Sequence, residues 1–241
     1  MYFDIHSHIL PSVDDGAKDM EDSLTLLKMM KKNGIDAVLA TSHFYPEQTN
    51  YDVYIEQTKY AFEQLKKKTK GKKLPEIYLG CEMLYYKGIG NSDMLAPLCL
   101  NGSRFLLLEL TDYNINEDLF EDILNLKENQ KIIPIIAHAE RYYKARNYKK
   151  FLGFLRENYI PVQINAASVM TRPYKKGAKT ILKSEMFCVI ATDTHSKEER
   201  PPLLNEAYGY IKEKYSEDLC AALLQNSEFM REKIIGENVE K

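Results

Sequence analysis

Short apolar runs alternate with longer segments of helical periodicity along the whole chain. Most of these runs are rich in leucine or β-branched residues and nearly continuous, as expected for parallel strands that are covered on both faces. The seven predicted strands are residues 2–6, 35–41, 77–82, 105–110, 131–138, 161–165 and 187–192. Strands that alternate with helices predict βα units, and therefore an α/β protein with parallel strands.

The segments between the strands carry helix-end signals. The clearest helix begins after Asp19, which can cap its first turn, and ends before Gly34. Further helices are predicted at residues 51–68, 117–130, 148–158, 174–183, 203–215 and 217–235. A chain of 241 residues without a Ser-, Gly- or Pro-rich linker fits one α/β barrel, so we expect residues 1–241 to form a single domain.

Charge and cysteine usage exclude several classes of protein. Lys and Arg total 33 against 35 for Asp and Glu, a net charge of −2, which indicates neither a nucleic-acid partner nor a membrane partner. The start has no basic leader, and no run approaches the ~18 apolar residues of a bilayer span, so we expect a cytoplasmic protein without membrane insertion. Four scattered cysteines without a CxxC pair predict reduced, mostly buried thiols.

All five histidines lie where predicted strands end. His6 and His8 end the first strand, His43 follows the second, His138 ends the fifth and His195 follows the seventh. In a parallel barrel these carboxyl ends form one rim, which is where such folds build their sites. A single histidine after a strand is more often structural than a ligand. Five histidines at the same rim favour a shared site.

Acidic residues follow the same pattern. Glu82 ends the third strand, Glu109 ends the fourth among leucines, and Asp193 follows the seventh. A carboxylate buried among leucines must find a cation or take up a proton. Asp14 and Asp15 fit a turn or helix cap beside a glycine, but their closeness to the first histidines makes one of them a candidate ligand as well.

The spacing of these residues points to metal ions. Residues two apart in an extended chain face the same side, so His6 with His8, and Asp193 with His195, can each reach one cation. Imidazole and carboxylate without thiolate suit Mn²⁺, Fe²⁺ or Zn²⁺. The set exceeds what one ion needs, so we infer two or three metals, and such clusters typically activate water for hydrolysis.

Two arginines indicate the bond that is hydrolysed. Arg141 and Arg200 each follow a histidine-bearing strand closely enough to reach the site, and the planar guanidinium matches phosphate oxygens. Each arginine has an alternative partner in the acidic residue that precedes it. No cysteine begins a C-x5-R motif, and no GxSxG or GxxxxGK[ST] motif occurs, which excludes the corresponding chemistries.

The ordered motifs of the chain resemble one family. They are DIHSHILPSVDDGA, ATSHF, GCEM, LLLEL, PIIAHAERY, VQINAAS, ATDTHS and RPP. In this order they resemble the PHP (polymerase and histidinol phosphatase) superfamily, and within it the bacterial capsule-type, manganese-dependent protein tyrosine phosphatases of the CpsB/YwqE group. The resemblance implies a distorted TIM-like (β/α)7 barrel, the PHP fold, with a metal site at the carboxyl ends of the strands.

The resemblance also implies three divalent metal ions, with manganese as the first candidate and iron or zinc as alternatives. It assigns one ion to His6, His8, Glu82 and Asp193. Glu82 would bridge to a second ion, held also by Glu109 and His138. The third ion is assigned to Asp15, His43 and His195, and the phosphate to Arg141 and Arg200.

The implied activity is that of a protein-tyrosine-phosphatase of the EC 3.1.3.48 type, in which a metal-bound hydroxide attacks phosphotyrosine. By resemblance, the substrate is the C-terminal tail of a bacterial tyrosine kinase that regulates capsular or exopolysaccharide biosynthesis. Four tyrosines near rim loops are candidates to pack against the phosphotyrosine ring: Tyr45, Tyr85, Tyr86 and Tyr113.

Three alternatives remain at this point. The nearest is another PHP activity, that of a histidinol phosphatase, phosphoesterase or nuclease, although relatives of those kinds usually carry histidine where this chain has Asp15 and Glu109. A metal-dependent amidohydrolase requires a carbamylated lysine at a strand end, and no predicted strand ends in lysine. A metal-binding regulator without turnover is disfavoured because every expected ligand and both arginines are present.

Overall fold

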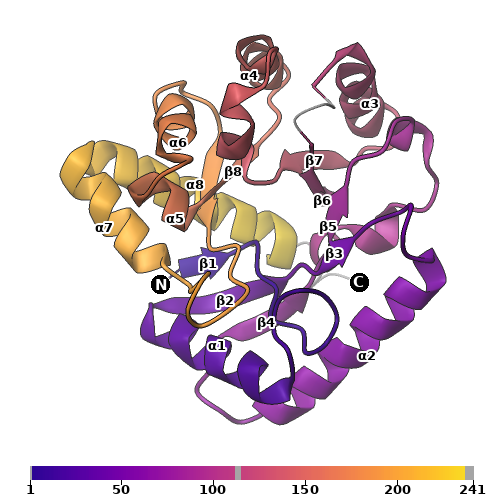
Figure 1. The fold of residues 1–241 in the computed structure, drawn as a ribbon, viewed down its shortest axis with the longest axis vertical. Helices are drawn as coiled ribbons and strands as arrows, with labels where there is room; N and C mark the ends of the chain where they lie inside the picture. The colour runs from indigo at the N-terminus through magenta and orange to yellow at the C-terminus, as the bar shows by residue number, and fades with distance from the viewer. Residues whose placement is uncertain (1, 112–114, 237–241) are drawn as a thin grey trace.

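The strands of the computed structural model, which describes residues 2–111 and 115–236, form two parallel sheets surrounded by helices (Figure 1). In the described part, the sheet orders are β1-β2-β4 and β3-β5-β6-β7-β8-β9. The strands are β1 (Tyr2–Asp4), β2 (Ile35–Ala40), β3 (His43–Phe44), β4 (Glu76–Leu79), β5 (Glu82–Leu84), β6 (Phe105–Glu109), β7 (Ile133–Ile136), β8 (Val162–Asn165) and β9 (Cys188–Ala191). The α/β prediction with parallel strands is therefore confirmed.

All seven predicted strands are present, but the third is divided. Its two parts, β4 and β5, are separated at Gly80, where an added Cβ atom would lie 2.7 Å from Leu100 Cδ2. The chain is interrupted in the same way after the second predicted strand. After β2 ends in the first sheet, the chain forms β3 in the second sheet, where His43 pairs with Glu82 of β5. A two-residue strand such as β3 is too short to leave a periodic pattern in the sequence.

Single hydrogen bonds connect the two sheets at the carboxyl ends of their strands. The Asp193 amide donates to His6 O at 2.9 Å, and Ser7 forms an isolated parallel bridge with Thr194. The Thr41 amide donates to Ser7 O at 2.8 Å. The first strand thus lies between the second and the last, as a barrel requires, although the regular sheets of the described residues do not merge into one continuous ladder.

The predicted helices are all present, with bounds that differ by at most two residues. Asp19 caps the first helix, as predicted, by accepting hydrogen bonds from the amides of Glu21 and Asp22. The helices are α1 (Met20–Lys32), α2 (Tyr51–Thr69), α3 (Glu117–Glu128), α4 (Tyr148–Glu157), α5 (Ala166–Met170), α6 (Lys175–Leu182), α7 (Leu204–Lys214) and α8 (Glu217–Ile235). Among the helices of the described residues, only the short α5 and four 3₁₀ helices were not predicted: η1 (Ile89–Asn91), η2 (Ala96–Leu98), η3 (Leu100–Gly102) and η4 (Ala139–Lys144).

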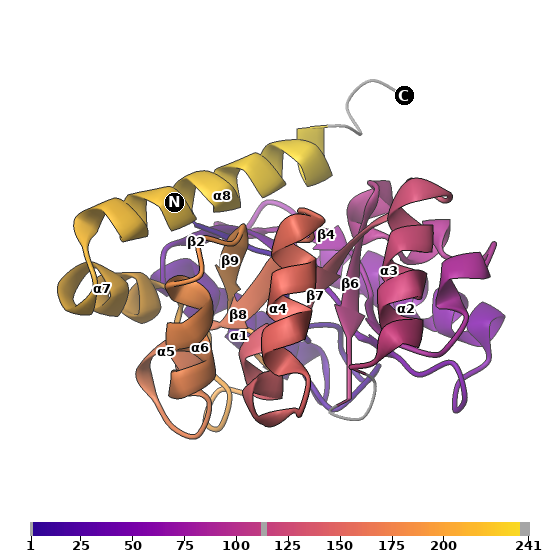
Figure 2. The same ribbon diagram turned by 90° about the horizontal axis from the view of Figure 1, so that it is seen from above.

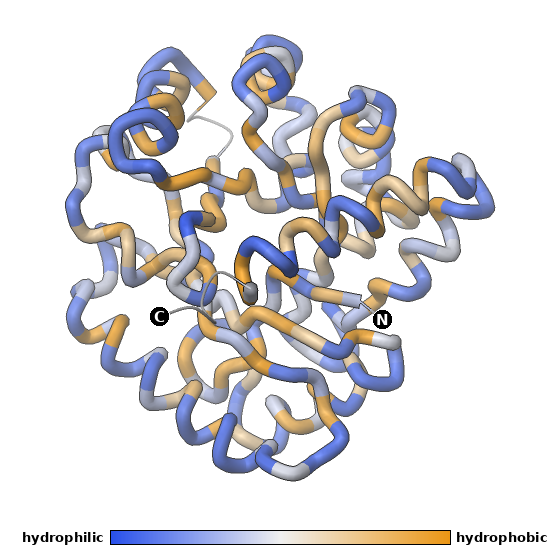
Figure 3. The backbone as a smooth tube through the Cα atoms, turned by 180° about the vertical axis from the view of Figure 1, so that it is seen from behind, coloured by the Kyte–Doolittle hydropathy of each residue, from blue (hydrophilic) through white to orange (hydrophobic). Residues whose placement is uncertain are grey.

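The side chains of each strand alternate between two apolar layers. A large outer layer lies between strands and helices, and hydrophobic and hydrophilic residues alternate along the helices in Figure 3. A smaller inner layer contains Phe105 and Leu107 of β6 and Ala191 of β9. Glu109 and Asp193 are the next members of these inner rows, so alternation alone directs their carboxylates to the centre of the rim.

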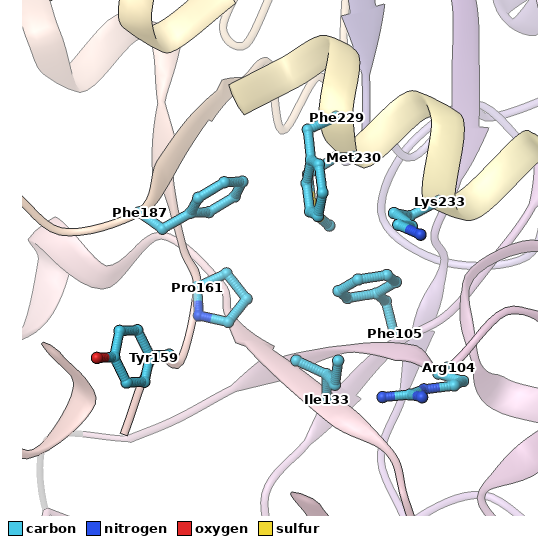
Figure 4. Close-up of a pocket in the computed structure, with 9 residues that line it drawn as sticks. All are labelled: Arg104, Phe105, Ile133, Tyr159, Pro161, Phe187, Phe229, Met230 and Lys233. Carbon is cyan, nitrogen blue, oxygen red and sulfur yellow. The ribbon is translucent and has the colours of Figure 1, made fainter. Parts of the chain in front are cut away.

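Helix α8 covers the opposite, amino-terminal ends of the strands (Figure 2). Its Met230 and Ile234 are buried in the inner layer. An apolar cavity of about 300 Å³ lies beside α8 (Figure 4), lined by Arg104, Phe105, Ile133, Tyr159, Pro161, Phe187, Phe229, Met230 and Lys233. This cavity is at the far end of the strands from the histidines. None of the described helices has the length and hydropathy that a membrane crossing requires.

Candidate metal centre

Glu82 is the centre of a cluster of imidazole and carboxylate groups. Its Oε2 atom lies 3.1 Å from His6 Nε2 and 3.0 Å from His43 Nδ1, and its Oε1 atom lies 2.9 Å from His138 Nε2. His6 Nε2 and His8 Nε2 are 3.1 Å apart. Ring nitrogens and carboxylate oxygens from four separate strands therefore point at one another across a small space.

The structure brings all nine predicted ligands together. Candidate ligand atoms lie within 4.8 Å of one another in three overlapping groups, which are His6, His8, Glu82 and Asp193, then His8, Asp15, His43 and His195, then His43, Glu82 and Glu109. The ninth residue, His138, places its Nε2 atom 3.3 Å from Glu109 Oε1. Their proximity is established, whereas their role as ligands stays a prediction.

Several atoms of the cluster have no hydrogen-bond partner. Among the described residues, eight buried side-chain N or O atoms are unpaired, and four of them belong to the predicted ligands: His43 Nδ1, Glu82 Oε2, Asp193 Oδ1 and His195 Nε2. Leaving a buried polar atom unpaired costs about 1–3 kcal/mol. Four such atoms are directed at one small space. Cations bound there would accept the lone pairs of these atoms, so the arrangement fits a metal site.

The carboxylates of the cluster are held in their charged form. Burial raises the pKa of Glu82, but the neighbouring imidazoles of His6, His138 and His43 outweigh it and hold the pKa well below its usual range. For Asp193, burial is likewise outweighed, mainly by His6 and His8, and its pKa is well below normal. Both groups are therefore anionic at neutral pH, as metal ligands must be.

The loop after His8 settles which of the two adjacent aspartates reaches the cluster. Asp15 Oδ1 lies 3.3 Å from His195 Nε2. Asp14 instead contacts two candidate ligands on the side away from the cluster. Its Oδ2 atom pairs with His8 Nδ1 at 2.8 Å and accepts a hydrogen bond from the His43 amide at 3.1 Å. Gly16 permits this loop, since an added Cβ would lie 2.1 Å from His8 O.

Two cluster residues hold an unusual backbone conformation. His138 has a φ of 31° and Asp193 a φ of 52°, in the left-handed region that non-glycine residues seldom adopt. Each residue lies two positions after the end of its strand, β7 or β9, and turns the chain into a rim loop. Such backbone strain costs roughly 1–3 kcal/mol and concentrates at functional sites.

Both predicted arginines bind Asp193 and not the acidic residues beside them. The guanidinium NH2 atoms of Arg141 and Arg200 each lie 2.5 Å from Asp193 Oδ2. Their side chains are 28% and 35% exposed, and Asp15 is 67% exposed, whereas Asp193 is buried. The cluster is therefore buried at Asp193 and open to solvent on the side of Arg141, Arg200 and Asp15. A polar cavity of about 320 Å³ adjoins it, lined in part by Asp15, His195 and Arg200.

Sequence reasoning assigned no role to several residues that support the cluster. Gln163 and Asn165 of β8 are buried and hydrogen-bonded to its members. Asp4 accepts the Thr192 amide at 2.9 Å and so joins the first and last strands below the ligands. The sequence did contain a signal for Gln163 and Asn165. They are polar residues two positions apart within an apolar strand, so they face the same interior as the predicted ligands.

The four rim tyrosines have different surroundings. Tyr45 stacks on His43, with ring centroids 5.0 Å apart, and lies at the mouth. Tyr85 is buried and donates to Asp122 at 2.8 Å, so it is a packing residue and not a substrate contact. Tyr86 lines a separate apolar cavity beside α2, and Tyr113 lies outside the described residues.

The cysteines take no part in the cluster. Cys81, Cys99, Cys188 and Cys220 are all free and buried, as predicted. Burial raises the pKa of Cys99 and of Cys188 to about 12, which keeps both thiols protonated at neutral pH. Thiolate chemistry at these two residues is therefore disfavoured.

Fold and site together define an α/β protein of parallel strands whose carboxyl ends carry a histidine and carboxylate centre suited to several cations. The chain belongs to the capsular polysaccharide synthesis CpsB/CapC family, whose sequence model matches residues 2–231. It is 29% identical over 231 residues to tyrosine-protein phosphatase CpsB of Streptococcus agalactiae, covering 86% of this chain and 88% of that protein. It is 31% identical over 228 residues to the putative tyrosine-protein phosphatase CapC of Staphylococcus aureus, covering 90% and 86%.

A solved structure supports the same architecture. It was described as one of the crystal structures of YwqE from Bacillus subtilis and CpsB from Streptococcus pneumoniae, "unique metal-dependent tyrosine phosphatases". The TM-score is 0.78, the identity is 24%, and the match covers 94% of this chain and 93% of that one. At this identity the likeness establishes the fold, which agrees with the PHP-type prediction.

Proposed function

We propose that this protein is a metal-dependent protein-tyrosine-phosphatase. The observation that carries the proposal is the cluster itself, in which four unpaired buried atoms face one another beside two arginines that share Asp193. The names of the CpsB and CapC relatives support the phosphatase activity. The metal dependence of the tyrosine phosphatases YwqE and CpsB, whose fold this chain shares, supports the role of cations.

The cluster can hold three divalent cations, for which manganese is the first candidate. One is assigned to His6, His8, Glu82 and Asp193, and this set forms one of the compact groups of ligand atoms. A second is assigned to Glu82, Glu109 and His138, in which His138 Nε2 lies 2.9 Å from Glu82 Oε1 and 3.3 Å from Glu109 Oε1. The third is assigned to Asp15, His43 and His195, to which the geometry adds His8.

The chemistry divides between the cations and the protein. When bound, divalent cations at these positions would act as Lewis acids and lower the pKa of water towards 7. Arg141 and Arg200 stand at the open side of the cluster, where their guanidinium groups can bind the non-bridging phosphate oxygens and offset the charge that develops there. Asp193 holds both guanidinium groups at one point and so orients them.

The proposed substrate is a phosphotyrosine-bearing protein, in particular the C-terminal tail of a bacterial tyrosine kinase that regulates capsular or exopolysaccharide synthesis. The family's connection with capsule synthesis supports this assignment. Tyr45, stacked on His43 at the mouth, is placed to contact the substrate ring. A kinase tail of this kind implies a cytoplasmic enzyme, and the family match over residues 2–231 supports one catalytic domain.

A substrate panel tests this proposal. The purified protein, loaded with Mn²⁺, is assayed on a phosphotyrosine peptide, histidinol phosphate and single-stranded DNA, before and after chelation. We expect hydrolysis of the peptide to dominate and to disappear with the metal. Preferential hydrolysis of histidinol phosphate would contradict the assignment of phosphotyrosine as the substrate. Activity that survives chelation would contradict the metal-dependent mechanism.

A further inference from the structure

Strand β8 contributes two amide side chains to the floor of the metal centre. Val162 and Ile164 face the outer apolar layer, so the alternate residues Gln163 and Asn165 face inward, where both are buried. The two amides are bonded to each other, with Gln163 Nε2 donating to Asn165 Oδ1 at 2.8 Å. They connect His6, on the first strand, with Asp193, after the last.

A backbone amide fixes the direction of this chain of hydrogen bonds. The His138 N–H group can only donate, and it lies 2.7 Å from the outer end of the Gln163 side chain, so that atom is the oxygen Oε1. Gln163 Nε2 then faces Asn165 Oδ1, and Asn165 Nδ2 faces Asp193 Oδ2 at 2.6 Å. Neither amide can flip without placing two donors or two acceptors against each other.

The same oxygen determines which nitrogen of His6 carries the proton. His6 Nδ1 lies 3.1 Å from Gln163 Oε1, a carbonyl oxygen that cannot donate, so His6 pairs with it only as Nδ1–H. Neutral His6 therefore presents its Nε2 lone pair to the space between Glu82 and His8. This is the tautomer that a metal ligand needs.

The other end of the chain orients Asp193. Asn165 Nδ2 donates to Oδ2, the oxygen that also accepts from Arg141 and Arg200. Oδ1 is left without a hydrogen bond and points towards His6 Nε2 at 3.4 Å. The two oxygens of the carboxylate therefore have different partners: Oδ2 binds the arginines, and Oδ1 remains available to a cation.

We infer that Gln163 and Asn165 are positioning residues that set the tautomer of His6 and the orientation of Asp193 for cation binding. The inference rests on the proposed metal centre and extends it to residues that do not touch the ions. Partners that orient metal ligands typically change metal affinity or activity by about 10- to 100-fold when they are removed. A packing role alone would affect stability and leave the tautomer of His6 unchanged.

Gln163→Met tests the inference, because it keeps the length of the side chain and removes its hydrogen bonds. Mn²⁺ affinity is measured by titration calorimetry and by the electron paramagnetic resonance signal of free Mn²⁺. We expect the affinity of the tightest site to fall about 10- to 100-fold. Gln163→Glu retains an acceptor for His6 and loses the donor to Asn165, so its affinity should lie between those of the parent and Gln163→Met.

Gln130→Met is the matched control. Gln130 is partly buried and donates to Gly90 O at 2.5 Å, away from the cluster. The control should bind Mn²⁺ with the parent's affinity. If Gln163→Met fails to fold, Asn165→Leu serves instead, and it should weaken Mn²⁺ binding less strongly because both arginines still contact Asp193 Oδ2. Parental Mn²⁺ affinity in whichever variant folds would overturn the inference.

A second readout separates positioning from packing. In ¹⁵N-labelled, metal-free protein, long-range ¹H–¹⁵N spectra identify the protonated nitrogen of His6, because a cation bound to Nε2 would by itself place the proton on Nδ1. The parent should show Nδ1–H, and Gln163→Met should lose this single state, whereas an unchanged Nδ1–H signal would contradict the inference. Neither readout uses a phosphotyrosine substrate, so a protein that binds Mn²⁺ without phosphotyrosine activity would disprove the proposed function and still test the positioning pair.

Discussion

At the scale of single residues, the centre depends on histidines whose charge changes when a cation binds. Burial lowers the pKa of His138, but hydrogen bonds to Glu109 and Glu82 outweigh it and raise the pKa to about 9. Burial opposes protonation of His8 as well, yet Asp14, Asp193 and Glu82 raise its pKa well above normal. Without a cation, both rings are therefore doubly protonated at pH 7, and their positive charges balance the charges of the carboxylates.

Metal binding should consequently release protons. Because the folded pKa of His138 exceeds the unfolded value of about 6.5, its protonation stabilises the metal-free protein fully below pH 6.5 and no longer above pH 9. Cation binding needs the neutral ring, so Mn²⁺ affinity should rise across the same window. Titration calorimetry at pH 7 in buffers of different ionisation enthalpy should show release of at least one proton per protein. Proton-neutral binding would contradict this charge assignment.

Thiol reagents should leave the protein active. With a pKa of about 12, Cys99 and Cys188 carry a thiolate fraction of about 1 in 30,000 at pH 7.5. Iodoacetamide should therefore label the folded protein slowly, with phosphatase activity retained and mass spectrometry showing little adduct. The unfolded protein, in which all four cysteines are accessible, is the positive control. Rapid inactivation of the folded protein would implicate a cysteine.

The convergence of the candidate ligand residues was largely predictable, whereas the residues that support them were not. Histidine and carboxylate at a strand end carry a chemical signal, because burial without a partner is costly for them. Gln163 and Asn165 are uncharged, and their role depends on which backbone N–H group they meet. The residue pattern alone left Asp14 and Asp15 open, whereas the family resemblance assigned Asp15, the aspartate that the turn at Gly16 directs towards His195.

At the scale of elements, the position of Arg141 depends on the packing of α6 against η4. Gly177 in α6 makes this close approach possible, since an added Cβ would lie 2.1 Å from Glu140 O. Because this contact is with backbone, α6 and η4 must separate to accept a larger residue. The guanidinium group on η4 would move with them.

Gly177→Ala should therefore destabilise the protein by about 1–3 kcal/mol and impair binding of phosphate more than binding of Mn²⁺. Urea unfolding measures the first effect, and competitive inhibition by inorganic phosphate measures the second. Gly153→Ala in α4 is the matched control, because nothing lies within 4 Å of the added Cβ. It should be neutral or stabilising by about 0.5–1 kcal/mol. Equal effects of the two substitutions would contradict the packing argument.

Element boundaries were predictable where local chemistry sets them. Asp19 and its partners mark the start of α1, and α8 spans the predicted residues 217–235. The short α5 and β3 were missed because five or two residues hold too little of a period to recognise. The division of β4 from β5 falls at Gly80, where distant Leu100 leaves no room for a Cβ atom, and no local pattern reveals that proximity.

At the scale of the whole molecule, the apolar packing of α8 and the candidate metal centre lie at opposite ends of the strands. Helix α8 covers the amino-terminal ends with Met230 and Ile234, and the cluster lies at the carboxyl ends. The alternation of apolar strands with helical segments predicted the parallel α/β fold, and the polar residues at strand ends predicted the rim. The way the first and last strands meet was not predictable, because it depends on Asp4 and on single bridges between distant segments.

Met230→Ala should destabilise the protein by about 2–5 kcal/mol, because it leaves a cavity in the inner layer. Mn²⁺ affinity should stay within twofold of the parent at a temperature where both proteins are folded. Urea unfolding and calorimetry provide the two measurements. Exposed Glu228 on the same helix supplies the control, and Glu228→Ala should change stability by less than about 0.5 kcal/mol. A large loss of Mn²⁺ affinity in Met230→Ala would show that the two ends are coupled.

The central claim is that ligands from separate strands converge on a cation cluster, and anomalous X-ray diffraction tests it most directly. Crystals loaded with Mn²⁺ are measured on both sides of the manganese absorption edge. The account predicts three anomalous peaks at the rim, the first among His6, His8, Glu82 and Asp193. A rim without any peak in crystals that bind Mn²⁺ elsewhere would contradict it.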